Sequence, residues 1–424
     1  MKIANRAMAA VSCLSLLAAC SGLTACSGGG GGAGARGSTA PAARPDGGAT
    51  RHQAGPTASP TPSAVPVSRR WRDVGRLPLA DSSGLMDVVA TGPRQAWALG
   101  FENGAEDDGG YATVARWNGA KWSKLPIPRY LGYDGFDATG PNDLWIAGGD
   151  TVARWDGRRW TEKRPFGISE DKRFHDVASD GDRAVLIGSD GPRSFIVTSG
   201  RGGYELVTGD GESMLNAVTS RAGHTWIVGA KPRANCDGVT PDIVHSRKAD
   251  GSGWDHLRVP DIRGGTLTSV VQISPTDVWA VGKIVNSRQV DPLPDRSCPA
   301  AVYDAPEGAE SRATPLALHW DGRSWKREEL PLLTAEPTGV TAFGPDDVWV
   351  AAADPDRPAD PLFLHFDGRT WTAERGAGGR IEAVAAIPGT KDLWAVGWPG
   401  DYEDHGSAVV LRRDGRARPG RARS

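Results

Sequence analysis

A tryptophan-centred apolar strand recurs along this chain, and each copy is followed by a polar turn between two further strands. Residues 277–282 (Asp-Val-Trp-Ala-Val-Gly) show the first part, and residues 320–325 (Trp-Asp-Gly-Arg-Ser-Trp) show the second. The two parts alternate seven times between Leu85 and Gly415. A period of about 50 residues, with several short strands in each unit, is typical of a closed ring of sheets.

Each repeat is expected to contribute four strands, which we name a to d in chain order. Strand a is short, strand b carries a central apolar residue, strand c alternates in polarity, and strand d begins at the second tryptophan. The central residues of strand b are Trp97, Trp145, Leu186, Trp226, Trp279, Trp349 and Trp394. The third repeat is degenerate, because it keeps the apolar pattern and lacks the tryptophans.

An Asp-Gly or Asn-Gly step marks most of the c–d turns. Both residue types tolerate the positive φ of a tight hairpin, so these steps predict hairpins. In residues 117–122 (Trp-Asn-Gly-Ala-Lys-Trp) a turn of either two or four residues places both indoles on one face of the sheet. Because tryptophan is large and apolar, we expect each pair of indoles to be buried against a neighbouring blade.

The last repeat is incomplete. The turn at Asp414 is followed by residues 416–418 (Arg-Ala-Arg) and by no strand-d tryptophan, whereas residues 71–78 (Trp-Arg-Asp-Val-Gly-Arg-Leu-Pro) match the strand-d segment at 122–126. An N-terminal strand that completes the last blade would remove the open edges of a linear array. We therefore predict an all-β, seven-bladed β-propeller with four-stranded antiparallel blades, closed by its N-terminal strand.

The Trp-Asp-Gly-x-x-Trp turns and the Val-Trp-Ala-Val-Gly strands resemble the repeats of kelch-like propellers, the type found in the central domain of galactose oxidase. The resemblance covers roughly residues 71 to 415 and implies the propeller fold. Strict kelch repeats carry a Gly-Gly pair in every blade, and here only Gly148-Gly149 occupies that place. The resemblance implies no particular activity, because one fold hosts many functions.

The N-terminal region has the pattern of an export signal with a lipid-attachment site. A positively charged start precedes an apolar run over residues 7–19, which is too short for a spanning helix. Residues 17–20 (Leu-Ala-Ala-Cys) and 23–26 (Leu-Thr-Ala-Cys) both resemble a bacterial lipobox. We expect lipidation at Cys20 or Cys26 and an anchor at the outer face of the cytoplasmic membrane, in the cell-wall zone; a plain secretory signal is the alternative.

Composition divides the chain into four predicted parts. Residues 1–26 form the signal peptide and lipobox, and residues 27–68, rich in Gly, Ala, Ser and Pro, form a disordered tether. Residues 69–416 form the propeller, and residues 417–424 form a basic disordered tail. The net charge of −2 provides no overall field that favours nucleic acid.

Two cysteines remain for the folded region. Cys236 and Cys298 fall in the b–c loops of the fourth and fifth repeats, which are neighbours on one face of the ring. Since an exported compartment permits disulfides, we predict a Cys236–Cys298 bond, with two separate thiols as the alternative. No group of Cys and His residues has zinc spacing, and we expect no metal and no cofactor.

The b–c and d–a loops of a propeller share one face, which we call the loop face. The b–c loops of this chain vary in length, whereas the turns on the other face are short, and elaborated loops on a rigid scaffold are where binding residues tend to lie. Aromatic and acidic residues of the contiguous repeats 7, 1 and 2 gather on this face. The candidate ligand-binding residues are Phe101, Asp107, Asp108, Tyr111, Tyr130, Tyr133, Trp398, Tyr402, Glu403, Asp404 and His405.

Aromatic side chains beside carboxylates suit sugar rings or the anchor residues of a protein partner. We therefore expect a monomeric, non-catalytic binding module at the cell surface that recognises a glycan or a surface protein through its loop face. One alternative is a polysaccharide-active enzyme of the glycosidase type, which needs two carboxylates such as Asp108 and Glu403. The other alternative is an accessory or structural subunit of a surface assembly. No catalytic residue is assigned.

Overall fold

The computed structural model describes residues 65–415 except 104–109, 129–131, 133, 166–167, 169–171, 182, 191–192, 201–202, 209–212, 234–237, 248–252, 286–312, 333, 377 and 400–405. These residues form the strands β1 to β28. The described part of the chain contains no helix that is long and apolar enough to cross a membrane.

Seven four-stranded antiparallel sheets make up the described residues, as the sequence predicted. Blade 1 contains β2 (Gly84–Gly92), β3 (Gln95–Glu102), β4 (Tyr111–Trp117) and β5 (Trp122–Leu125). Blade 2 contains β6 (Gly135–Gly140), β7 (Asp143–Gly148), β8 (Thr151–Trp155) and β9 (Trp160–Lys163). Blade 3 contains β10 (Lys172–Asp180), β11 (Arg183–Asp190), β12 (Arg193–Gly200) and β13 (Gly203–Thr208).

The remaining blades follow the same order of strands a to d. Blade 4 contains β14 (Met214–Arg221), β15 (His224–Pro232), β16 (Val239–Ser246) and β17 (Trp254–His256). Blade 5 contains β18 (Gly265–Ser274), β19 (Asp277–Ile284), β20 (Thr314–Trp320) and β21 (Trp325–Glu328). Blade 6 contains β22 (Glu336–Gly344), β23 (Asp347–Ala353), β24 (Leu362–Phe366) and β25 (Trp371–Arg375). Blade 7 contains β26 (Arg380–Ala386), β27 (Leu393–Trp398), β28 (Val409–Arg413) and β1 (Trp71–Asp73).

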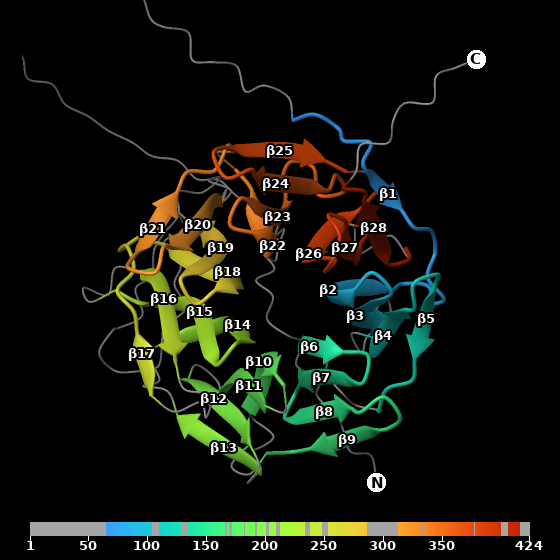
Figure 1. Cartoon of the computed structure of the whole chain (residues 1–424), viewed down its shortest axis with the longest axis horizontal. Helices are drawn as coiled ribbons and strands as arrows, with labels where there is room; N and C mark the ends of the chain where they lie inside the picture. Colours follow the sequence, from blue (N-terminus) through green and yellow to red (C-terminus); the bar gives the residue numbers. More distant parts are fainter. Residues whose placement is uncertain are drawn as a thin grey trace, which may run out of the picture. The chain divides into compact units, whose positions relative to one another are not determined.

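The blades stand in a ring with strand a of each blade innermost and strand d outermost (Figure 1). Each innermost strand contacts the innermost strand of the next blade, and β26 of blade 7 contacts β2 of blade 1. The ring is therefore closed, which confirms the predicted seven-bladed propeller.

Blade 7 is built from both ends of the described chain. β1 pairs antiparallel with β28, with Trp71 opposite Arg413. The Arg72 guanidinium donates to both carboxylate oxygens of Asp414, at 2.6 and 2.5 Å. The prediction that the N-terminal strand completes the last blade is confirmed.

The segment that precedes β1 also contacts blade 6. The Ser68 N–H donates to the carbonyl oxygen of Arg375 at 2.8 Å, and the Arg375 N–H donates to the carbonyl oxygen of Pro66 at 2.9 Å. Val67 forms a parallel bridge with Arg375 at the outer edge of β25, and Val65 packs against a small apolar cluster of this blade. The N-terminal segment thus lies along the outer edges of two consecutive blades.

Each strand-b tryptophan is buried against the following blade. Trp394 of blade 7 contacts Trp117 and Trp122 from the c–d hairpin of blade 1, with both ring centroids 5.2 Å away. The buried tryptophans of strand b are Trp97, Trp145, Trp226, Trp279, Trp349 and Trp394. Because a tryptophan buries roughly 200 Å² of largely apolar surface, these contacts contribute much of the stability of the ring.

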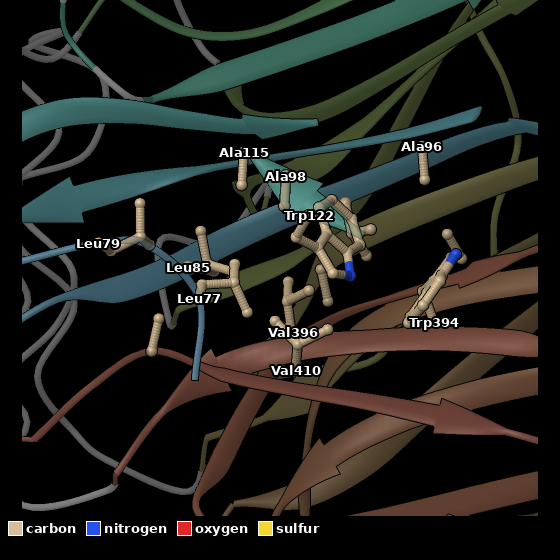
Figure 2. Close-up of a cluster of buried hydrophobic side chains, with 14 of the residues drawn as sticks. Leu77, Leu79, Leu85, Ala96, Ala98, Ala115, Trp122, Trp394, Val396 and Val410 are labelled. Atoms are coloured by element: carbon tan, nitrogen blue, oxygen red, sulfur yellow. The ribbon is translucent and has the colours of Figure 1, made fainter. Parts of the chain in front are cut away.

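Figure 2 shows the apolar contact between blades 7 and 1. Leu77 and Leu79, from the segment that joins β1 to β2, pack with Leu85 of blade 1 and with Val396 and Val410 of blade 7. The segment that enters blade 1 therefore fills the junction at which the ring closes.

Blade 3 departs from the predicted alignment by one residue. Val185, rather than Leu186, occupies the position of the tryptophans, because Val185 packs with Trp254 of the following blade. Leu186 packs instead with Trp145 of the preceding blade. The four consecutive apolar residues 184–187 contain no alternation that fixes the register, but Gly188 corresponds to the glycine that ends the Val-Trp-Ala-Val-Gly motif and places Val185 at the tryptophan position.

The turn between β4 and β5 contains four residues. The Asn118 Oδ1 atom accepts hydrogen bonds from the N–H groups of Ala120 and Lys121, both at 3.0 Å. Gly119 has a φ of 96°, which explains why glycine follows the Asn or Asp of this motif. The first side chain of three other c–d turns accepts in the same way: Asp156, Asp321 and Asp367.

A β-bulge in strand a explains the glycine that ends the Val-Trp-Ala-Val-Gly motif. In six blades the pairing of strands a and b shifts by one residue near the beginning of strand a. The carbonyl of strand a then lies against strand b. A Cβ atom on Gly397 would clash with the carbonyl oxygen of Arg380, and one on Gly100 would clash with that of Gly84. Glycine avoids this clash in blades 1, 3, 4, 5 and 7, whereas blade 6 accommodates Ala352 at the equivalent position.

Candidate binding site at the loop face

Three of the residues predicted to bind a ligand lie in the described part of the chain: Phe101, Tyr111 and Trp398. The other candidates lie outside the described residues: Asp107, Asp108, Tyr130, Tyr133, Tyr402, Glu403, Asp404 and His405. The cysteines with predicted roles also lie outside them: Cys20, Cys26, Cys236 and Cys298. Asp108 and Glu403, the two carboxylates of the enzymatic alternative, thus lie outside the described residues.

Phe101 and Trp398 meet beside the first residue of β2. Phe101 lies near the end of β3 in blade 1, and Trp398 is the last residue of β27 in blade 7. An ideal Cβ atom on Gly84 would lie 2.7 Å from Cζ of Phe101 and 3.1 Å from Cβ of Trp398. Two aromatic residues about 300 positions apart therefore come together where blades 7 and 1 join.

Tyr111 belongs to the same hairpin as Phe101 and points to the other face of its sheet. Tyr111 pairs with Glu102, and Phe101 pairs with Ala112. Because neighbouring positions of a strand alternate between the two faces, Tyr111 does not join the pair of Phe101 and Trp398. Its side chain remains 59% exposed.

Two charged residues of β26 hold the Trp398 side chain. The Trp398 Nε1–H donates to Glu382 Oε1 at 2.8 Å, and the same oxygen accepts a hydrogen bond from Arg380 Nε at 2.5 Å. The Arg380 guanidinium carbon lies 6.0 Å from the centroid of the indole. We call these three residues the Trp398 cluster. One carboxylate oxygen thus fixes both the indole and the guanidinium.

Glu382 occupies one of seven equivalent positions around the axis of the ring, which we call rim positions. In six blades the rim position is the residue that forms the β-bulge of strand a, and in blade 2 it is the residue directly before β6. From blade 1 to blade 7 these residues are Met86, Asp134, His175, Asn216, Thr268, Thr338 and Glu382.

The rim side chains of blades 4, 5 and 6 hold the ring together. Each donates a hydrogen bond to a backbone carbonyl in strand a of the next blade. The donor and acceptor pairs are Asn216 Nδ2 with Leu267 at 2.8 Å, Thr268 Oγ1 with Pro337 at 3.1 Å, and Thr338 Oγ1 with Ile381 at 3.0 Å. These three residues therefore have a structural role that accounts for their type.

The rim side chains of blades 7, 1, 2 and 3 differ in kind. Glu382 accepts from its own blade, and Met86 carries only a thioether. Asp134 Oδ2 accepts the N–H of Gly149 at 3.1 Å, within blade 2. His175 Nε2 lies 2.7 Å from Ser189 Oγ within blade 3, and burial lowers the pKa of this imidazole. Four contiguous rim positions thus depart from the inter-blade pattern.

Three aspartates lie further along the innermost strands of blades 1, 2 and 3: Asp87 and Asp176 directly follow the rim positions, and Asp137 lies three residues after Asp134. Asp137 Oδ2 accepts the backbone N–H and the hydroxyl of Ser179 in blade 3, at 2.7 and 2.9 Å. Asp176 Oδ2 accepts the N–H of Val218 in blade 4 at 2.9 Å. Asp87 accepts the N–H of Val88 at 2.7 Å. Asp137 and Asp176 therefore connect neighbouring blades.

The same inter-blade connection is made by neutral side chains elsewhere in the ring. Ser269 Oγ accepts the N–H of Val340 at 3.2 Å, and Thr341 Oγ1 accepts the N–H of Ala386 at 2.9 Å. A hydroxyl is thus sufficient for the structural task in blades 5 and 6. Blades 2 and 3 use a charged group for it, at the extra cost of burying a carboxylate.

Burial controls the ionisation of these aspartates. It raises the pKa of Asp87 to about 7, and it also raises the pKa of Asp137 and, more strongly, that of Asp176. Mutual repulsion adds to this effect, because the negative charge of Asp137 raises the pKa of the other two. Asp87 therefore retains part of its protons near neutral pH, and burial opposes the ionisation of Asp137 and Asp176 in the same direction.

Sequence analysis missed the Trp398 cluster partners and the three aspartates. Glu382 and Arg380 stand on strand a, which the sequence analysis treated only as a short packing strand. Counting back from the end of strand b does not align these positions, because Glu382 lies 15 residues before Gly397 whereas Thr268 lies 14 residues before Gly282. The change from hydroxyl to carboxylate becomes a signal only once the β-bulges are known.

Comparison with known proteins supports the fold. No family model and no curated protein matches this chain. It is similar to a chain of the mitotic checkpoint complex, with 12% identity over 86% of this chain and 98% of that chain and a TM-score of 0.51. It is also similar to the Cps50 (Swd1) β-propeller domain of Myceliophteria thermophila, with 11% identity over 80% and 99% of the two chains and a TM-score of 0.49. YCF48 bound to a D1 peptide has 13% identity over 72% and 99% of the chains and a TM-score of 0.41. At these identities the likeness concerns the fold alone.

Proposed function

We propose that this protein is a non-catalytic binding module that holds a glycan or a surface protein at its loop face, against blades 7, 1, 2 and 3. The asymmetry of the rim positions carries this proposal. Three of them connect neighbouring blades, whereas the other four are contiguous and carry Glu, Met, Asp and His. Residues that depart together from a structural pattern, on a rigid scaffold, are candidates for recognition.

The aromatic residues of the loop face support the same arc of the ring. Phe101 and Trp398 meet at the junction of blades 7 and 1, inside this arc. Aromatic side chains that combine apolar area with few rotatable bonds are frequent anchors at binding sites.

The state of the described carboxylates favours binding over catalysis. Glu382, Asp134, Asp137 and Asp176 all accept hydrogen bonds from groups of the protein itself. A carboxylate that acts as a general acid or base must reach the substrate, whereas Asp137 and Asp176 are engaged between blades. These two side chains support the site, and Glu382 positions Trp398.

We further propose that the module is exported and anchored by a lipid on Cys20 or Cys26, with residues 27–64 as the tether, because Pro66 and Ser68 already pair with blade 6. A Cys236–Cys298 disulfide would then restrain the long b–c loops of blades 4 and 5, outside the binding arc. The combination would present the loop face to ligands of the cell-wall zone.

A site-specific photocrosslinker tests the binding face without assuming a ligand class. Tyr111 is 59% exposed at the loop face, so a benzophenone amino acid in its place is expected to fold normally. The matched control carries the same group at Arg323, which is exposed in the c–d turn of blade 5, on the other face of the ring. Irradiation of intact producing cells should give an adduct from position 111 and none from position 323.

The adduct should also depend on the aromatic junction. In a Trp398→Ala background, we expect the yield from position 111 to fall at least about fivefold if the ligand uses this junction as a hot spot. Equal adducts from positions 111 and 323, or a yield that does not depend on Trp398, would contradict the proposed site.

A further inference from the structure

The Trp398 cluster has a composition that selects among ligand classes. It contains one indole, one guanidinium and one carboxylate, so its formal charge is zero. The two charged groups are in contact, with Arg380 Nε 2.5 Å from Glu382 Oε1. Their side chains are partly exposed, at 28% for Arg380 and 15% for Glu382. A donor and an acceptor therefore stand next to each other at the edge of an aromatic ring.

Charged ligands fit this arrangement poorly. A cation is attracted to the face of an indole, but the guanidinium of Arg380 already lies 6.0 Å from the ring centroid. An anion would be drawn to Arg380, but it would meet the Glu382 carboxylate at hydrogen-bonding distance from the same guanidinium. Each charged class thus meets a like charge within the cluster.

A neutral sugar ring fits the same groups well. Its C–H face is apolar and packs on an aromatic surface, and its adjacent hydroxyls each donate and accept hydrogen bonds. The guanidinium nitrogens can donate to one hydroxyl while the carboxylate accepts from the next, and hydrogen bonds to charged groups are the stronger kind. The aromatic face and the polar pair are therefore complementary to the two sides of a pyranose.

We infer that the ligand of this propeller is a neutral glycan, with one sugar ring packed on Trp398 and its adjacent hydroxyls bound by Arg380 and Glu382. The inference rests on the proposed binding function and names its ligand class. Glu382 also acts as a positioning residue, since it holds the indole through Nε1. Phe101, which meets Trp398 beside Gly84, extends the aromatic surface.

The test uses the full chain and an array of neutral and acidic oligosaccharides as probes. The wild-type protein should bind neutral members of the array, and the affinity for the best of them is then measured by titration calorimetry. Trp398→Ala should weaken binding by about tenfold or more, because it removes a central aromatic anchor. Glu382→Gln should weaken binding by about fivefold or more, because the amide keeps an acceptor for the indole and loses the charge.

A matched control exists in the neighbouring blade 6. Glu336 begins the innermost strand of blade 6 and forms an ion pair with Lys283 at 3.0 Å, as Glu382 does with Arg380. Glu336→Gln should leave glycan affinity unchanged. Gly84→Ala adds a Cβ atom 2.7 Å from the Phe101 ring, so it should reduce binding by displacing the aromatic pair without removing either residue.

The outcomes separate this inference from the proposed function. Neutral-glycan binding that falls in Trp398→Ala and Glu382→Gln but not in Glu336→Gln supports both. An array with no bound neutral glycan, or binding that ignores Trp398, overturns the glycan inference. If the crosslinker at position 111 then captures a protein in a Trp398-dependent manner, the binding function stands with a different ligand. If it captures nothing, both fail.

Discussion

Replacement of Trp71 by alanine tests how the ring is closed. Trp71 is only 4% exposed, and its indole stacks on Phe363 of blade 6 with ring centroids 3.7 Å apart. Its Nε1–H donates to Glu374 Oε1 at 2.8 Å, and Arg413 Nε donates to the same oxygen at 2.7 Å. One side chain therefore connects the first strand of the chain to blades 6 and 7.

The expected loss of stability follows from these contacts. Truncation of a buried tryptophan to alanine costs about 3–5 kcal/mol through lost burial and the cavity that remains. The hydrogen bond to Glu374 adds about 1 kcal/mol, because Arg413 still satisfies that carboxylate. We expect Trp71→Ala to lower the free energy of unfolding by about 4–6 kcal/mol. Trp71→Phe keeps an aromatic ring against Phe363 but loses the hydrogen bond and part of the buried volume, so it should cost less than Trp71→Ala, about 2–3 kcal/mol.

Urea unfolding, followed by tryptophan fluorescence and circular dichroism, measures these differences. Trp160 provides the control, since it occupies the same strand-d position in blade 2 and donates to the carbonyl oxygen of Pro126 at 2.9 Å. Trp160 is less buried, so Trp160→Ala should cost about 1–3 kcal/mol. If Trp71→Ala costs no more than Trp160→Ala, the N-terminal strand does not close the ring in the way that the contacts indicate.

Two further predictions concern the innermost strands. The pKa of Asp87 is about 7 in the folded protein against an ordinary value of 3.8. Its contribution to stability is therefore fully present below about pH 4 and is lost as the pH rises through 7. In Asp87→Asn the urea midpoints at pH 5 and pH 8 should differ less than they do in the wild type. Gly397→Ala places a Cβ atom against the carbonyl oxygen of Arg380 and should cost about 1–3 kcal/mol in the same assay, whereas Gly92→Ala, which meets nothing within 4 Å, should be near neutral. A pH dependence unaltered by Asp87→Asn, or equal costs for the two glycine variants, would contradict these assignments.

The architecture was predictable because the repeat carries its own register. The tryptophans and the Asp-Gly turns recur in alternation, and the match between residues 71–78 and 122–126 predicted the closing strand. Blade 3 shows what this reasoning depends on. Without a tryptophan, its run of apolar residues fits either register by polarity alone, and Gly188 together with the packing of Val185 on Trp254 decides between them.

The site was less predictable because it depends on contacts between distant repeats. The loop face and the pair of Phe101 and Trp398 follow from the order of the blades around the ring. The link from Trp398 to Glu382 depends on the β-bulge, which adds a residue to strand a and is not visible in a polarity pattern. Tyr111 was grouped with Phe101 and Trp398 from the sequence. In the structure it pairs with Glu102 rather than with Phe101, which puts its side chain on the other face of the sheet.

The position of β1 in blade 7 has a consequence for the order of events during synthesis. Trp71 is synthesised long before its partner Glu374, which lies 303 residues further along the chain. Until Glu374 and β28 have been synthesised, Trp71 and β1 have no partners in blades 6 and 7. The pairing of β1 with β28, which closes the ring, therefore joins segments that lie far apart in sequence. The ring can therefore close only after β28, the partner of β1, has been synthesised.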